Sequence, residues 1–98
     1  MRDYKISFTK RADKDEIKIY DYITENFGEI YADNFRQKLI TFLQLLSKEP
    51  HLGRPAKQDS SLIDYIFNKQ NKIVDKITEQ DITIIRILHT NTNLASKF

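Results

Sequence analysis

A histidine and several cations in the last third of the chain are of the residue types that can cleave an RNA backbone. His89 closes the apolar run Asp81–Thr90, and an imidazole with an unperturbed pKa near 6.5 can serve as acid or base. Cleavage of RNA to a 2′,3′-cyclic product needs an acid, a base and cations for the phosphate charge. Lys72, Lys76 and Arg54 are candidates for that charge. The simpler interpretation, which we favour, is that His89 is a strand-end residue bonded to the backbone.

The composition excludes several other kinds of site. The chain has 98 residues, which predicts one domain over residues 1–98. It has no cysteine, and its two histidines, His51 and His89, do not have the spacing of a metal motif, so we expect no metal and no cofactor. The net charge of +2 is too small to indicate nucleic-acid binding by itself. No apolar stretch approaches the roughly 20 residues that span a bilayer, and we expect a cytoplasmic protein with no membrane contact.

Hydrophobic spacing predicts where the secondary structure lies. Residues 4–8 alternate as a short strand does, and Thr9 is a plausible helix N-cap. A helical stripe then runs from Ala12 to Phe27, where Gly28 should end the helix in a left-handed conformation. A second stripe begins almost at once, so the two helices should form an antiparallel hairpin. Its residues are Ala32, Phe35, Leu39, Phe42 and Leu46, with Pro50 ending the helix and a polar loop following to about Ser61.

The last third of the chain predicts three strands, over residues 62–67, 72–78 and 81–89. The order is therefore β-α-α-β-β-β. A helical hairpin packed on a small, mostly antiparallel sheet is an α+β architecture.

The final hairpin, with Glu79-Gln80 as its turn, predicts two different faces. One face carries the basic residues Lys72 and Lys76 with His89, around Val74, Ile85 and Ile87. The other is the core face, where Asp75 and Arg86 lie diagonally among the residues Ile73, Ile77, Ile82, Ile84 and Leu88. A buried arginine without a partner is costly, so we interpret Asp75 and Arg86 as a structural ion pair.

Three segments together resemble the ParE/RelE superfamily of bacterial toxins from type II toxin–antitoxin systems. They are ADKDEIKIYDYITENFGEIYADNF, KEPHLGRP and KIVDKITEQDITIIRILHT, and they occur in the family's order over about residues 4–92. The long helical hairpin and the R-I-L-H ending are more similar to the ParE branch, often labelled plasmid-stabilisation proteins. Two residues depart from the pattern: Glu16 stands where a leucine is usual, and Asp75 where a tyrosine is common.

The resemblance implies a toxin that is neutralised by a cognate antitoxin in a hetero-oligomer. ParE-type toxins poison DNA gyrase and catalyse no reaction, whereas RelE-type toxins cut mRNA on the ribosome. We expect the first mechanism and keep the second as the alternative; a third possibility is an interaction module that is no longer toxic.

The resemblance also implies where partners bind. It places the loop of Arg54 and Lys57 beside the functional face, so these residues join Lys72, Lys76 and His89 as candidate contacts with the target or the antitoxin. The aromatic residues at helical spacing are expected mostly in the core; they are Tyr20, Tyr22, Tyr31, Phe35 and Phe42. Tyr22 lies off the apolar stripe and is the best candidate for an exposed aromatic side chain that an antitoxin covers.

Overall fold

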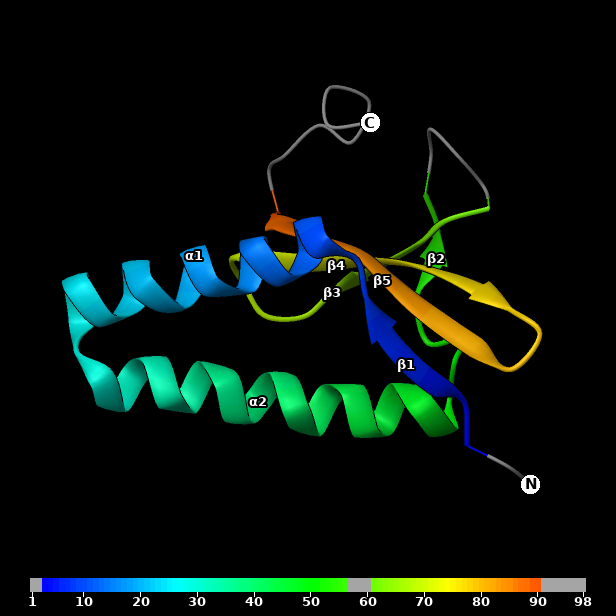
Figure 1. Cartoon of the computed structure of the whole chain (residues 1–98), viewed down its shortest axis with the longest axis horizontal. Helices are drawn as coiled ribbons and strands as arrows, with labels where there is room; N and C mark the ends of the chain where they lie inside the picture. The colour runs from blue at the N-terminus through cyan, green and yellow to red at the C-terminus, as the bar shows by residue number, and fades with distance from the viewer. Residues whose placement is uncertain (1–2, 57–60, 91–98) are drawn as a thin grey trace.

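The computed structural model describes residues 3–56 and 61–90. Within them the chain forms two long helices and a five-stranded sheet (Figure 1). The elements are β1 (Lys5–Phe8), α1 (Lys10–Phe27), α2 (Glu29–Lys48), β2 (Arg54–Pro55), β3 (Ile63–Ile66), β4 (Asn71–Thr78) and β5 (Asp81–His89). The predicted α+β architecture is confirmed, with the two-residue strand β2 added inside the predicted polar loop.

The sheet has the strand order β1-β5-β4-β3-β2. β1 runs parallel to β5, and all other neighbours are antiparallel. The parallel pair follows from the topology, because the helical hairpin carries the chain away from β1 before it returns through β2, β3 and β4. The main core lies between one face of the sheet and the helices, and its buried residues are Ala12, Leu39, Leu46, Tyr65, Ile73, Ile82, Ile84 and Ile87.

A single residue, Gly28, joins α1 to α2. The Thr9 hydroxyl caps the start of α1 by accepting from the Ala12 N–H at 3.0 Å, as predicted. At the other end Gly28 has φ 100° and ψ 166°, and its N–H donates to the carbonyls of Ile23 and Thr24. The positive φ is as predicted, but the ψ is extended rather than left-handed helical. This region is essentially restricted to glycine, so the sharp reversal between the helices depends on Gly28.

Polar contacts join the facing sides of the two helices. Arg36 of α2 donates to both carboxylate oxygens of Glu16, at 3.0 and 3.1 Å, and its guanidinium lies 3.8 Å from the centre of the Tyr20 ring. The hydrogen bond from Arg36 to Glu16 raises the pKa of the arginine. Tyr20 also donates to Asp33 at 2.7 Å. Glu16 is therefore matched by an arginine on the neighbouring helix.

The β4–β5 hairpin has a bulge that the sequence did not reveal. The predicted pairing holds from Thr78–Asp81 to Asp75–Ile84, after which Val74 pairs with Arg86 and Ile85 is left over. The bulge lies where β1 ends, since Phe8 pairs with Ile84. Beyond this point β5 bonds instead to the start of the helical segment: the Thr9 hydroxyl donates to the Ile85 carbonyl, and the Ile87 N–H donates to Asp15.

The bulge reverses the predicted faces for the rest of β5. Because side chains alternate along a strand, one extra residue moves every later side chain to the other face. Ile87 therefore joins the main core, while Leu88 packs on the other face with Val74 and Ala56. We call this other face, which is turned away from the main core, the outer face.

Candidate functional site

The outer face carries most of the predicted basic residues in two rows across the strands. Register places Arg54, Asp64, Val74 and Arg86 in one row, because residues paired directly across neighbouring strands share a face. Lys72 lies in the next row with Ile66 and Leu88. Arg54 and Lys76 are exposed, whereas Lys72 and Arg86 are buried. The predicted candidate Lys57 lies outside the described residues.

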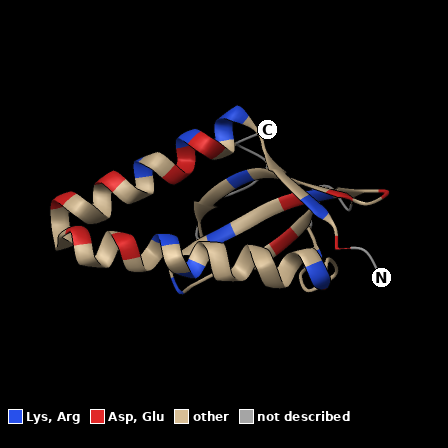
Figure 2. Ribbon diagram, turned by 60° about the horizontal axis from the view of Figure 1, so that its bottom comes forward, with Lys and Arg blue, Asp and Glu red and all other residues tan. Residues whose placement is uncertain are grey.

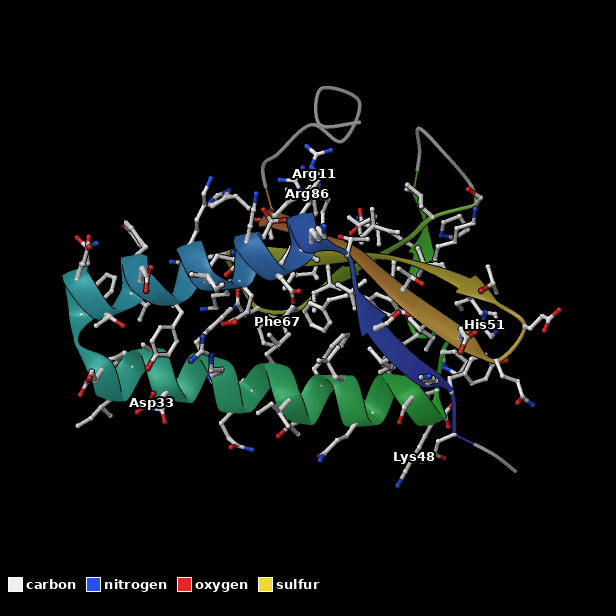
Figure 3. The ribbon with its side chains drawn as sticks, viewed as in Figure 1. Arg11, Asp33, Lys48, His51, Phe67 and Arg86 are labelled. Atoms are coloured by element: carbon white, nitrogen blue, oxygen red, sulfur yellow. The ribbon has the colours of Figure 1, made fainter. Side chains whose placement is uncertain are left out.

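The predicted ion pair between Asp75 and Arg86 is wrong. Arg86, which is labelled in Figure 3, pairs instead with Asp15 of α1. Its Nε lies 2.7 Å from Oδ2 and its Nη2 lies 3.0 Å from Oδ1. The hydrogen bond to Asp15 raises the pKa of Arg86. The physical reason is the bulge at Ile85, which turns Arg86 to the outer face and toward the edge of β5, away from Asp75.

Asp75 remains buried in the main core, on the helix-facing side of β4. It is 0% exposed, and neither carboxylate oxygen has a hydrogen-bond partner among the described residues. Burial raises the pKa of Asp75 to about 7. Its neighbour Tyr65 cannot serve as the donor, because the Tyr65 hydroxyl donates to the Pro50 carbonyl. The pKa of Tyr65 rises to about 12, mainly through burial and secondly through the charge of Asp75.

His89 does not join the predicted basic face. It pairs with Asn71 at the end of the hairpin, and the bulge places this pair on the helix side of the sheet. There His89 and Tyr22 line a groove of about 320 Å³ between α1 and the ends of β4 and β5. The three catalytic candidates are thus divided between two faces, with His89 on one and Lys72 and Arg54 on the other.

The exposed aromatic residues form a group at the α1–α2 joint. Tyr22 is exposed as predicted, but Phe27 and Tyr31, which the helical spacing predicts to be core residues, are exposed as well. The rings of Tyr22 and Phe27, and those of Phe27 and Tyr31, meet edge to face at 6.5 and 6.4 Å. The helical stripe does continue to this point, but here the hairpin extends past the strands and nothing in the described chain covers it (Figure 1). Phe35 and Phe42 do pack against Phe67, as core residues should.

The described residues contain no cluster of three or more potential metal ligands. None of the helices in the described part of the chain has the length and apolar character needed to cross a bilayer.

The arrangement of helices and strands is that of known bacterial toxins. The chromosomal ParDE toxin–antitoxin system of P. aeruginosa matches with a TM-score of 0.75 at 19% identity, covering 88% of this chain and 95% of that one. The RelBE2 toxin–antitoxin complex of Mycobacterium tuberculosis matches with a TM-score of 0.55 at 19% identity, covering 89% and 98%. The YoeB/ParE toxin of Agrobacterium tumefaciens matches with a TM-score of 0.60 at 10% identity, covering 87% and 96%. The fold is therefore shared with solved structures from both a ParDE and a RelBE system.

The sequence identifies the family. Residues 6–94 match the model of the ParE toxin of type II toxin–antitoxin systems, parDE. A sequence search of curated proteins finds no match. The chain belongs to the ParE toxin family.

Proposed function

We propose that this toxin acts by binding DNA gyrase, without a catalytic step of its own, and that a cognate antitoxin neutralises it in a hetero-oligomer. The observation that carries the proposal is the separation of His89 from Lys72 and Arg54 by the sheet. A general acid or base must reach the reacting oxygen within about 3 Å, while the cations hold the same phosphate. Groups on opposite faces of a sheet cannot meet these two conditions together.

The ion pair between Arg86 and Asp15 supports the same mechanism, binding without catalysis. Two of the Arg86 guanidinium nitrogens are already bonded to the carboxylate of Asp15, and the side chain is only 10% exposed. Its charge is therefore largely neutralised before any phosphate could approach. An arginine used in this way stabilises the fold rather than a transition state.

The groove between α1 and the hairpin end suits the antitoxin. Its lining combines the apolar side chains of Ile19, Ile23 and Ile87 with Tyr22, His89 and polar residues such as Asp15. A segment with alternating apolar and polar residues can fill such a groove. We assign the predicted partner contacts Tyr22 and His89 to this interaction, in the cytoplasm where gyrase acts.

Purified gyrase and relaxed plasmid test the proposal. We expect the toxin to inhibit supercoiling at micromolar concentration and the purified antitoxin to restore it. Unchanged supercoiling at that concentration would overturn the proposal. Unchanged growth on induction without antitoxin would instead identify a chain that is no longer toxic.

One observation favours the alternative, a ribosome-dependent mRNA endoribonuclease. Arg54 and Lys72 lie in adjacent rows of the outer face, as cations that hold an RNA backbone would. Programmed ribosomes distinguish the two mechanisms. Cleaved mRNA that disappears with Arg54→Gln would establish the nuclease, whereas intact mRNA together with inhibited gyrase would exclude it.

A further inference from the structure

The α1–α2 joint, with the residues on either side of it, forms an exposed apolar tip. The apolar tip residues are Phe27, Ile30 and Tyr31, which are 62%, 76% and 64% exposed. Ile30 and Tyr31 line a shallow hollow with Gly28 and Asn34. Figure 1 shows the tip projecting away from the sheet, at the opposite end of the molecule from the β4–β5 turn. Small soluble proteins rarely leave contiguous aromatic and aliphatic side chains exposed unless a partner covers them.

The charged residues of the chain segment that forms the tip are all negative. No lysine or arginine occurs between Lys18 and Arg36, whereas four acidic residues do: Asp21, Glu25, Glu29 and Asp33. In Figure 2 the charged positions coloured on the ribbon at this end of the hairpin are all acidic. Asp21 and Glu25 are one helical turn apart on α1, a spacing at which like charges destabilise a helix. The spacing of Asp21 and Glu25 costs stability locally, so this pair is better explained by binding than by folding.

The apolar centre and acidic rim of the tip determine which kind of partner it can bind. Exposed aromatic side chains supply contact energy when a pocket encloses them, and the charged rim sets the orientation and the rate of encounter. The acidic rim repels RNA phosphates, and it would repel the same tip on a second copy of the chain. The surface therefore fits a protein with an apolar depression bordered by lysine and arginine.

We propose that the hairpin tip docks onto a basic, DNA-binding surface of the toxin's target enzyme. This inference rests on the proposal that the target is gyrase. An enzyme that binds DNA presents lysine and arginine to the phosphates, which is the chemistry that the acidic rim complements. The Tyr22 ring contacts Phe27 and also borders the groove assigned to the antitoxin. An antitoxin in that groove therefore lies beside the tip and obstructs docking there.

Charge reversal at the rim tests the docking surface. In the variant Asp21→Lys/Glu25→Lys both side chains are exposed, and lysine near the end of α1 suits the helix dipole, so folding should be retained. The matched control is Glu49→Lys/Glu79→Lys, which makes the same charge change on exposed residues at the other end of the molecule. We expect the tip variant to need about tenfold more toxin for half-inhibition of supercoiling, and the control to stay within about twofold of wild type.

Removal of apolar contact provides a second test. Ile30→Ser leaves no internal cavity because the side chain is exposed, and Ile17→Ser is the control on an exposed part of α1. We expect about a tenfold weaker inhibition for the first and little change for the second.

The outcomes separate the two proposals. A wild-type toxin that does not inhibit gyrase overturns both the gyrase mechanism and the docking inference. Wild-type inhibition that the tip variants retain in full overturns only the docking surface. Tip variants that inhibit gyrase normally but lose affinity for the antitoxin also overturn it, because the surface then belongs to the antitoxin. Self-association that disappears with Ile30→Ser overturns it in favour of a second copy.

Discussion

Two buried ionisable side chains on neighbouring strands are accommodated in opposite ways. Arg86 of β5 has a bidentate partner in Asp15, which also accepts the N–H of Ile87. Asp75 of β4 is more deeply buried and has no hydrogen-bond partner among the described residues. Arg86 keeps its charge because the opposite charge of Asp15 lies beside it. Asp75 avoids most of the cost of burial because its carboxyl group remains protonated up to about neutral pH.

The largest effect should come from removing the partner of Arg86. Asp15→Ala leaves a buried guanidinium without its carboxylate and the Ile87 N–H without its acceptor. We expect a loss of about 5 kcal/mol in the free energy of unfolding, since breaking a buried ion pair costs roughly 3–5 kcal/mol and an unmet hydrogen bond adds to it. Urea unfolding measures the loss, with the exposed Asp13→Ala as the control on the same helix. A loss below about 1 kcal/mol would mean that Arg86 finds another partner.

An effect of nearly the same size should come from Asp75, as a pH dependence of the free energy of unfolding. Its pKa rises from 3.8 to about 7 on folding, which corresponds to about 4 kcal/mol. The folded state keeps a proton that the unfolded state has lost, so this group lowers stability as pH rises from about 4 to about 7. Above pH 7 the cost is constant.

Asp75→Asn removes the titration and keeps the shape. We expect its stability relative to wild type to increase by about 4 kcal/mol between roughly pH 4 and pH 8, measured by urea unfolding at both. If the stability difference between Asp75→Asn and wild type does not change with pH, the charged Asp75 carboxylate has a hydrogen-bond partner.

The smallest effect should come from the half-exposed pair between the helices. The Arg36 side chain is 43% exposed, so water screens its interaction with Glu16. A double-mutant cycle with Glu16→Gln and Arg36→Gln should give a coupling of about 0.5–1 kcal/mol that falls at high salt. A coupling energy above about 2 kcal/mol would show that this pair behaves like the buried pair of Arg86 and Asp15.

Local signals in the sequence predicted the fold well. Thr9 and Gly28 mark the ends of α1 through chemistry that lies within a few residues of each. The register of the hairpin next to its turn was also predictable, because the turn fixes it. The ion pair was not predictable, because the partner of Arg86 lies 71 residues earlier in the chain and the bulge carries no glycine that would mark it.

The candidate site was predictable only in part. The exposure of Tyr22 followed from its position off the apolar stripe. The exposure of Phe27 and Tyr31 did not, because a stripe shows which side chains share a face and not whether another element covers that face. The position of His89 depends on the same bulge. Simple alternation along the strand puts the catalytic candidates on one face, whereas the bulge divides them between two faces.

The single-residue joint at Gly28 has a thermodynamic consequence for recognition. A flexible loop that presented the same side chains would lose conformational entropy on binding, at about 0.5–1.5 kcal/mol for each side chain that becomes fixed. Here two helices lead directly into the joint, and the edge-to-face contacts of Phe27 with Tyr22 and Tyr31 already restrict the rings. Much of the ordering is therefore completed during folding, before any partner arrives.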